Sequence, residues 1–256
     1  MTRLAFGLDR QQIRRFLVGM LGLTCLVLAI SLPRIPATAQ ITQAIVQEIL
    51  DKGEVYVQDE KATLEQVAAF NEVIVTKDES RTALLFSNLA AGRLAPNSSV
   101  TVGQCVEVQQ GQLVASGPVN GCLGGFVADV QGTIYVMDAD DGGKFQVLEG
   151  DVEVNKAGGG EAVNVQQGQQ VAIENGQLGA VEKISFEEFV KILKGALFEG
   201  FTVPLPNQDK LLDICQDLRQ EALGGTEGEI IGNVLGVPQC PTELGIRVRP
   251  PIRLPF

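Results

Sequence analysis

The residues with the clearest potential for chemistry lie in one acidic segment, Asp138-Ala139-Asp140-Asp141-Gly142-Gly143, with Glu149 a few positions further on. Alternating carboxylates, a glycine turn and a glutamate at the twelfth position form the pattern of a calcium-binding loop. Gly142 stands at the fifth position, where another oxygen ligand is expected. Turns between two strands favour the same Asp and Gly residues. We therefore predict no metal site, and Asp138, Asp140 and Glu149 remain the candidate calcium ligands.

Four cysteines outside the N-terminal apolar segment offer the second kind of chemistry. They are Cys105, Cys122, Cys215 and Cys240, and four cysteines allow three pairings. A zinc site with four thiolates is the alternative, but no two of them have the C-x-x-C spacing that such sites favour. We predict disulfides, with the sequence-local pairs Cys105–Cys122 and Cys215–Cys240 closing two short loops.

The composition excludes several classes of enzyme. The chain has neither His nor Trp in its 256 residues. Ser-His-Asp and Cys-His triads, His-liganded zinc or haem sites and imidazole proton relays are therefore ruled out. The sequence also has no nucleophile elbow, no phosphate-binding glycine loop and no metalloprotease helix. We predict a protein that is not an enzyme and has no catalytic residue and no cofactor.

The N-terminus has the three parts of a secretory signal peptide. Arg3, Arg10, Arg14 and Arg15 precede an apolar stretch at 16–32, and Ala37-Thr38-Ala39 follows it. We predict that residues 1–39 are a signal peptide, cleaved between Ala39 and Gln40, and that the mature protein is periplasmic or secreted. The alternative is a segment that stays uncleaved as a membrane anchor, because its length is at the lower limit for spanning a bilayer.

The charge of the chain argues against nucleic acid as a partner. The formal net charge is −11, and removal of residues 1–39, with five Arg and one Asp, changes it to −15. Phosphate backbones and anionic lipids attract basic surfaces and repel an acidic one.

Residues 44–182 have the pattern of a β domain. Short runs such as Glu54–Val57, Glu72–Val75 and Val100–Val102 carry β-branched residues at a period of about two. A strand–glycine–strand unit recurs around Gly111, Gly150 and Gly168, at unequal spacing. This predicts an irregular β-roll or jelly-roll-like domain, although any β-sandwich with glycine turns fits nearly as well.

The pattern changes at Ser185, so we expect a helical region at 183–225. Ser185 and Glu188 form a capping box, and Phe186, Phe189, Val190 and Leu193 mark one apolar face. A second helix is expected from 208 to 223, ending at Gly224-Gly225. Residues 226–256 are predicted to be an extended, Pro- and Arg-rich tail that Cys215–Cys240 tethers to the second helix.

Four segments of the β region together resemble the FecR domain of bacterial envelope regulators. They are Ser80–Phe86, Arg93–Val100, Val130–Val136 and Val147–Val154, similar to the family's S-R-A-x-L-x-F, R-L-G-x-N-S, R-G-T-x-F-x-V and V-L-E-G-x-V-x-V. The residues that carry this resemblance are Ser80, Arg81, Arg93, Asn97, Ser98, Gly132, Thr133, Glu149 and Gly150. Ala95 and Gln131 depart from the pattern, which puts in doubt any site that would use those two positions. The likeness covers roughly residues 44–175 and implies a β-rich extracytoplasmic domain for sensing or interaction.

The same resemblance limits the function. Iron-transport regulators of the family also carry a cytoplasmic helical segment that binds a sigma factor, followed by a membrane span. About 15 residues precede the apolar stretch here, too few for a helical domain, so we expect no anti-sigma segment. Structural use of Arg81 and Arg93, as partners of carboxylates, is favoured over ligand binding.

The sequence leads to three functional hypotheses. The first is a non-enzymatic extracytoplasmic module for protein recognition or envelope signalling, with an envelope protein as partner, contacted through exposed strands or the Arg-Pro tail. The second is a structural envelope protein that binds a wall polymer. The third is a metal-responsive sensor. Contact with a membrane is expected only if the signal segment is retained.

Overall fold

The computed structural model describes residues 41–160, 162–224 and 237–244. All of them belong to one unit of the chain. The predicted signal peptide, its cleavage site between Ala39 and Gln40 and most of the predicted tail therefore lie outside the described residues.

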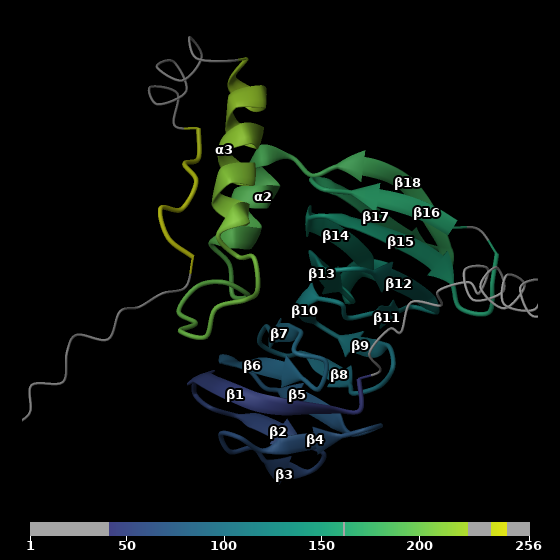
Figure 1. The fold of residues 1–256 in the computed structure, drawn as a ribbon, viewed down its shortest axis with the longest axis vertical. Coiled ribbons are helices and arrows are strands. Elements are labelled where there is room, and N and C mark those ends of the chain that lie inside the picture. Colours follow the sequence, from purple (N-terminus) through teal and green to yellow (C-terminus); the bar gives the residue numbers. More distant parts are fainter. Residues whose placement is uncertain (1–40, 161, 225–236, 245–256) are drawn as a thin grey trace, which may run out of the picture. The chain divides into compact units, whose positions relative to one another are not determined.

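The strands of the described chain form two nine-stranded sheets (Figure 1). Sheet A contains, in spatial order, β18 (Gln177–Lys183), β17 (Gln169–Glu174), β14 (Lys144–Glu149), β13 (Thr133–Asp138), β10 (Gln112–Gly117), β7 (Ala91–Leu94), β6 (Ser80–Phe86), β1 (Gln43–Asp51) and β4 (Val67–Ala69). Sheet B contains, in spatial order, β16 (Ala162–Gln166), β15 (Asp151–Lys156), β12 (Phe126–Val130), β11 (Gly121–Leu123), β9 (Val106–Gln110), β8 (Ser99–Thr101), β5 (Val73–Thr76), β2 (Val55–Val57) and β3 (Glu60–Lys61).

The chain advances steadily along both sheets at once. It passes from one sheet to the other after every one or two strands, and strands that follow each other in sequence remain near each other in both spatial orders. Pairing is antiparallel except at β9 and β11, which pair in parallel beside the disulfide Cys105–Cys122. This winding confirms the prediction of an irregular, mainly β roll.

The repeated glycines mark the corners where the chain changes sheet. Gly111 stands between β9 in sheet B and β10 in sheet A, and Gly150 joins β14 in sheet A to β15 in sheet B. Gly111 has a φ of +68°, a conformation that side chains with a Cβ rarely adopt. A Cβ at Gly111 would also lie 2.3 Å from Ser98 Oγ and 2.7 Å from the carbonyl oxygen of Asn97. The corner at Gly111 therefore requires glycine for two independent reasons.

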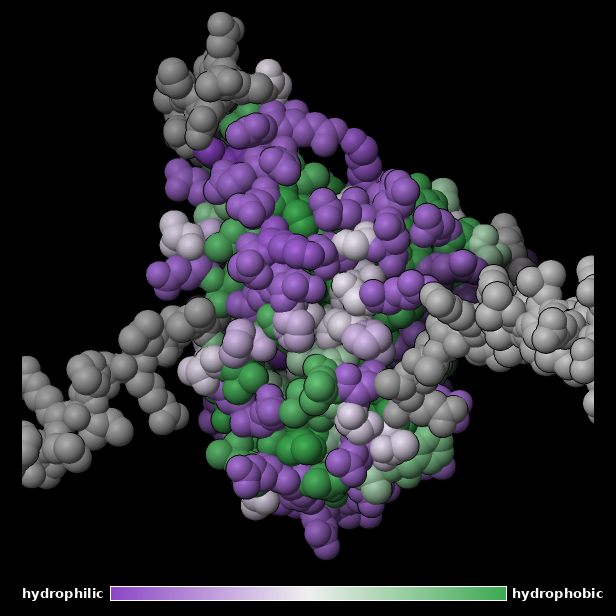
Figure 2. Space-filling model, viewed as in Figure 1, coloured by the Kyte–Doolittle hydropathy of each residue, from purple (hydrophilic) through white to green (hydrophobic). Residues whose placement is uncertain are grey.

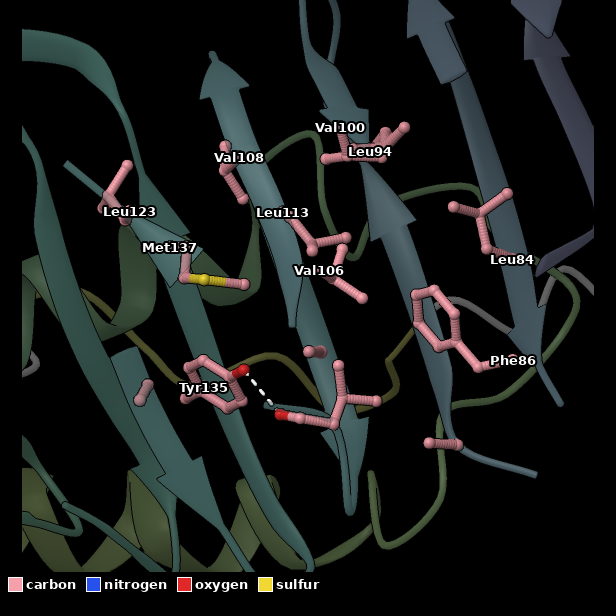
Figure 3. Close-up of a cluster of buried hydrophobic side chains, with 14 of the residues drawn as sticks. Leu84, Phe86, Leu94, Val100, Val106, Val108, Leu113, Leu123, Tyr135 and Met137 are labelled. Atoms are coloured by element: carbon pink, nitrogen blue, oxygen red, sulfur yellow. Dashed lines mark hydrogen bonds between the residues drawn. The ribbon is translucent and has the colours of Figure 1, made fainter. Parts of the chain in front are cut away.

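An inner core fills the space between the sheets. Alternate strand residues such as Leu84, Phe86 and Leu113 point into it and are at most 1% exposed (Figure 3). Each large apolar side chain that is buried in this way contributes about 1.5–3 kcal/mol. Tyr135 is fully buried there, and its hydroxyl donates a hydrogen bond to the Val119 carbonyl at 2.7 Å. Burial raises the pKa of Tyr135, so this hydroxyl stays protonated and remains a donor.

A second, outer core joins the helices to sheet A. Helix α2 (Phe186–Leu193) begins at Ser185, whose Oγ accepts a hydrogen bond from the Glu188 amide, as the capping box predicts. Helix α3 (Lys210–Leu223) ends at Gly224, and the two helices lie side by side (Figure 1). Their apolar faces pack on outward-facing residues of sheet A, among them Val114 and Val136. The helical region thus completes the core of one face of the roll.

Candidate functional site

The four cysteines form two disulfides. Cys215–Cys240 ties helix α3 to the segment 237–244, which confirms the predicted tether. Cys105–Cys122 links the loop before β9 to β11. Two disulfides indicate an oxidising compartment outside the cytosol.

The structure does not bring the three candidate calcium ligands together. Asp138 pairs with Lys144 at one end of the β13–β14 hairpin, whereas Glu149 pairs with Ile134 at the other end. Asp138 accepts hydrogen bonds from the Asp140 amide at 3.0 Å and from Gln112 Nε2 at 2.8 Å. Glu149 Oε1 accepts from Lys210 Nζ at 2.7 Å. Within the described ranges, no group of three or more Cys, Asp or Glu side chains is arranged to hold a metal ion.

Arg81 fastens the loop after helix α2 to strand β6. Its Nε lies 2.5 Å from an Asp51 carboxylate oxygen, and Nη1 donates to the carbonyls of Ala196 at 2.8 Å and Glu199 at 2.5 Å. Its guanidinium carbon also lies 5.3 Å from the centre of the Phe201 ring. Arg81 is thus a structural residue that joins the roll to residues 196–201.

Arg93 has the same structural role in β7, and it is fully buried. Its Nη2 donates to the Val203 carbonyl at 2.6 Å and to Gln208 Oε1 at 2.8 Å. The Phe201 ring centre lies 4.6 Å from the guanidinium carbon, a distance typical of a cation–π contact. Burial lowers the pKa of Arg93 to about 10, while the nearby carboxylate of Glu48 acts in the opposite direction. Arg93 therefore remains charged at neutral pH and holds the loop between the helices by its backbone.

Glu48 completes this attachment, and one further motif residue, Ser80, makes its contact within the roll. Ser80 is fully buried, and its Oγ accepts a hydrogen bond from the Glu54 amide at 2.9 Å. Glu48 Oε2 accepts from the Thr202 and Val203 amides at 3.0 and 3.1 Å. The sequence alone gave no signal for Glu48, because its partners lie more than 150 residues away in the chain.

The remaining motif residues shape corners of the roll. Asn97 adopts a φ of 55°, and Ser98 Oγ accepts from the Gln112 amide at 2.9 Å beside Gly111. Gly132 has a φ of 110°, and Thr133 Oγ1 donates to the Asp151 carbonyl at 2.9 Å, next to Gly150. These contacts are all made within the chain.

A polar pocket of about 330 Å³ lies between sheet A and helix α2. Gln146, 2% exposed, donates from Nε2 to Glu188 Oε1 at 2.9 Å, and Lys144 Nζ donates to the same oxygen at 3.2 Å. Asp138 and Lys191 are also at its wall, so acidic and basic groups balance. None of its lining residues is a Ser, Thr, Cys or His that could act as a nucleophile.

The most prominent surface feature is an apolar edge at β4, the outermost strand of sheet A. Leu64, Val67 and Phe70 are 60%, 47% and 47% exposed. We call these three residues the β4 edge. Figure 2 shows apolar surface at the end of the unit that carries β1 and β6, whereas the helices are covered mainly by hydrophilic side chains. The apolar run Val67–Phe70 between Glu65 and Glu72 is a readable signal of this edge in the sequence, but none of the predictions from the sequence includes it.

No helix within the described residues is long and apolar enough to cross a membrane. No protein-family model and no curated protein matches the chain. Two solved structures of a proposed anti-sigma factor from Parabacteroides distasonis ATCC 8503 are similar to it, both with 13% identity and a TM-score of 0.42. The similar regions cover 51% and 54% of this chain, and 68% and 72% of the two solved chains. Likenesses at this TM-score carry no weight for the function of this chain.

Proposed function

We propose that this chain is a non-enzymatic, extracytoplasmic FecR-like protein that recognises another protein of the cell envelope through the β4 edge. The observation that carries the proposal is the exposure of three large apolar side chains within seven residues, one in the outermost strand β4 and the other two just before and after it. Exposed apolar side chains that gather in one place are typical of protein-binding surfaces. A strand at the edge of a sheet also leaves backbone groups open to pairing with another chain.

The disulfides and the motif residues support this role indirectly. The two disulfides suit a protein that works outside the cytosol. The motif residues whose charge would suit ligand binding are Arg81 and Arg93. Both guanidinium groups are instead occupied by hydrogen bonds within the chain. Recognition through the surface of a rigid roll is therefore the function that we favour, and signalling in the envelope is the process in which we place it.

A comparison of surface variants in an envelope extract tests the proposal. The purified chain and a Val67→Ser/Phe70→Ser variant are each cross-linked to envelope proteins of the source organism, and the products are identified by mass spectrometry. We expect a discrete protein that the wild type captures and the variant does not. Leu89→Ser is the matched control, because Leu89 is 78% exposed but lies in the turn between β6 and β7.

Two results would contradict the proposal. One is equal capture by wild type and variant, which would place recognition elsewhere. The other is sedimentation of the wild type with purified peptidoglycan, undiminished by Val67→Ser/Phe70→Ser, together with no captured protein. That second result would favour the structural, wall-binding alternative.

A further inference from the structure

Two turns of the same construction enclose strand β4. One, Thr63–Gln66, lies before the strand, and the other, Ala69–Glu72, begins at its last residue. In each turn the amide of the fourth residue donates to the carbonyl of the first, at 3.2 Å and 3.0 Å. The third residue, Glu65 or Asn71, has a φ of +66°, whereas the second residue does not have a positive φ, which is the pattern of a type II turn. We call these two segments the twin turns.

One side chain closes each of the twin turns further. Gln66 Oε1 accepts a hydrogen bond from the Thr63 amide at 3.0 Å, and Glu72 Oε2 accepts one from the Ala69 amide at 2.8 Å. The amide and the carbonyl of the first residue are therefore both bonded within the turn. Each turn is thus held by two hydrogen bonds between its own first and fourth residues.

A β-bulge fastens each turn to a neighbouring strand. The Glu65 amide donates to the Val46 carbonyl at 2.8 Å, and the Asn71 amide donates to the Val102 carbonyl at 2.7 Å. In return, the amides of Val46 and Val102 donate to the carbonyls of the residues that follow Glu65 and Asn71, each at 2.9 Å. Two residues then face one residue of the opposite strand, as in a bulge. Val46 belongs to β1 of sheet A and Val102 directly follows β8 of sheet B, so the twin turns are fixed to both sheets.

The twin turns display two of the three residues of the β4 edge. Leu64 and Phe70 each occupy the second position of a turn, and Val67 lies midway between them in the sequence. The hydrogen bonds within the turns and the bulges fix the backbone that carries both side chains before any partner is bound. A surface that is fixed beforehand loses less conformational entropy on binding, and so it binds more tightly. The β4 edge is therefore a preorganised set of apolar anchors.

The same construction limits the pairing of β4 with an added strand. Hydrogen bonding to β1 alternates along β4, and the bond from the Val46 amide to the Gln66 carbonyl fixes its phase. The backbone groups of Val67 and Ala69 therefore point away from β1. Those of Ala69 are bonded within its turn, so Val67 is the one residue of β4, as the structure describes it, whose amide and carbonyl are both open. An added strand forms a series of such bonds, whereas β4 offers the groups of a single residue.

The charge around the β4 edge is acidic. Asp59, Glu60 and Glu65 are exposed, and no ion pair among the described residues includes them. Lys61, the one basic residue from 53 to 76, lies 4.0 Å from a Glu54 carboxylate oxygen. Strands β3 and β4 are the outermost strands of their sheets and lie at the same end of the roll (Figure 1), so these carboxylates lie beside the edge. A basic partner is attracted, and a second copy of this acidic edge is repelled.

We propose that the twin turns present Leu64, Val67 and Phe70 as preorganised anchors for a protein surface that has an apolar centre and a rim of Lys and Arg. The partner contacts side chains and does not extend sheet A as a further strand. This inference rests on the proposed role of the β4 edge in protein recognition, and it adds the chemistry of the partner and the mode of contact.

Selection of binding peptides tests the chemistry of the partner. The probe is a library of short random peptides, displayed on phage and selected on the immobilised full chain. We expect the enriched peptides to combine large apolar residues with Lys or Arg. Leu64→Ser/Phe70→Ser should weaken their binding about tenfold, whereas Leu89→Ser, at an exposed leucine outside the β4 edge, should leave it unchanged. Enrichment of acidic peptides, enrichment of none, or equal binding by the Leu64→Ser/Phe70→Ser variant would overturn the proposal.

Charge variants test the acidic rim with one enriched peptide. Asp59→Asn/Glu60→Gln/Glu65→Gln should weaken binding about tenfold at about 50 mM salt, where charge attraction is only partly screened. The matched control removes three exposed carboxylates in β17, β18 and helix α2, namely Glu174, Glu182 and Glu187, each changed to Gln. This control should weaken binding less than about twofold. Equal weakening by both triple variants would show general charge attraction and would contradict a local rim.

A variant of one turn tests the preorganisation. Gln66→Met keeps the length of the side chain but removes the acceptor of the Thr63 amide. We expect about fivefold weaker binding of the peptide, because the turn that carries Leu64 loses a hydrogen bond and is less fixed. Gln66→Glu keeps an acceptor and should bind at least as tightly as the wild type. Urea unfolding confirms that both variants fold, and equal affinity of folded Gln66→Met and wild type would show that the turn does not preorganise the edge.

Ester analogues of the peptide test the mode of contact. Esters replace the backbone amides at every second position, in either phase, which removes N–H donors and keeps the side chains. We expect both analogues to bind within about threefold of the parent peptide. A loss of more than about tenfold in one phase alone would show an added strand. That result would overturn this inference and leave the proposed recognition role intact, whereas unchanged capture of envelope proteins by Val67→Ser/Phe70→Ser would remove both.

Discussion

Arg93 and Gln208 share a hydrogen bond of 2.8 Å although 115 residues separate them in the sequence. Gln208 in turn donates to the Leu244 carbonyl, so one glutamine side chain connects strand β7, the loop between the helices and the segment 237–244. This connection is buried, and a buried acceptor that loses its donor is costly. The attachment of the C-terminal region to the roll therefore depends on Arg93.

We predict that Arg93→Met destabilises the protein by about 2–4 kcal/mol, because Val203 and Gln208 lose a charged donor in a buried site. Equilibrium unfolding in urea measures this change. Arg93→Lys should cost less, since an ammonium group can still donate to one of these acceptors. Hydrogen exchange should increase most in residues 196–208; an increase spread evenly over both sheets would contradict a local role for Arg93.

The loss in free energy of unfolding caused by Arg93→Met should be independent of pH between 5.5 and 8.5. Burial lowers the pKa of Arg93 to about 10, so the group is fully protonated throughout this range. Since its pKa in the folded protein is below the ordinary value, its contribution to the free energy of unfolding becomes more favourable only as pH rises through 10. Urea unfolding of both proteins at pH 5.5 and 8.5 checks this. A change of more than about 1 kcal/mol in the difference between them would contradict it.

Much of the fold could be predicted from the sequence, but the assignment of strands to the two sheets could not. The period-two run Glu72–Val75 predicts a strand, which the structure places at Val73–Thr76 as β5, and the capping box at Ser185 predicts the start of helix α2. A glycine between two strands, however, looks the same in a hairpin and in a corner between two sheets. Gly111 is a corner, because its flanking strands pair in different sheets, β9 with β8 in sheet B and β10 with β7 in sheet A.

The candidate site was harder to predict, because its contacts are long-range. The resemblance selected Arg81 and Arg93 as motif residues, but their acceptors, such as the carbonyls of Glu199 and Val203, lie more than 100 residues away. An arginine in a strand gives no indication of which backbone carbonyl it will meet. The exposure of Val67 likewise depends on the place of β4 at the edge of sheet A, which follows from the whole winding.

Alanine variants at two glycines separate the cost of backbone strain from the cost of steric crowding at the Gly111 corner. Gly111 and Gly176 have φ values of +68° and +74°, but only Gly111 has close neighbours at the position of a Cβ. We predict that Gly176→Ala costs about 1 kcal/mol, from backbone strain alone. Gly111→Ala should cost about 3 kcal/mol or more, because Asn97 and Ser98 would have to move as well. Thermal unfolding of both variants gives the comparison, and equal losses would show that the corner can open without cost.

Removal of the disulfide between helix α3 and the segment 237–244 should release that segment while the sheets remain folded. The loop closed by Cys215–Cys240 spans 25 residues, and such a crosslink contributes about 3 kcal/mol. In Cys215→Ser/Cys240→Ser, limited proteolysis should cut between residues 237 and 244 before any site in a strand. Cys105→Ser/Cys122→Ser is the control and should leave this segment resistant. Early cleavage within β10 or β13 of the first variant would mean that the helical region holds sheet A together.

We expect a strong energetic coupling between Glu149 and Lys210, because the carboxylate of Glu149 is largely buried and Lys210 supplies its positive charge. The Glu149 side chain is 12% exposed and that of Lys210 is 53% exposed, and Nζ lies 2.7 Å from Oε1. The other carboxylate oxygen, Oε2, is buried with no hydrogen-bond partner among the described residues. Lys210→Met would leave a largely buried carboxylate without its cation, so we predict a loss of about 1–3 kcal/mol in urea unfolding. Adding Glu149→Gln to Lys210→Met removes that charge and should recover part of the loss, whereas additive losses would show that the ion pair contributes nothing to joining helix α3 to β14.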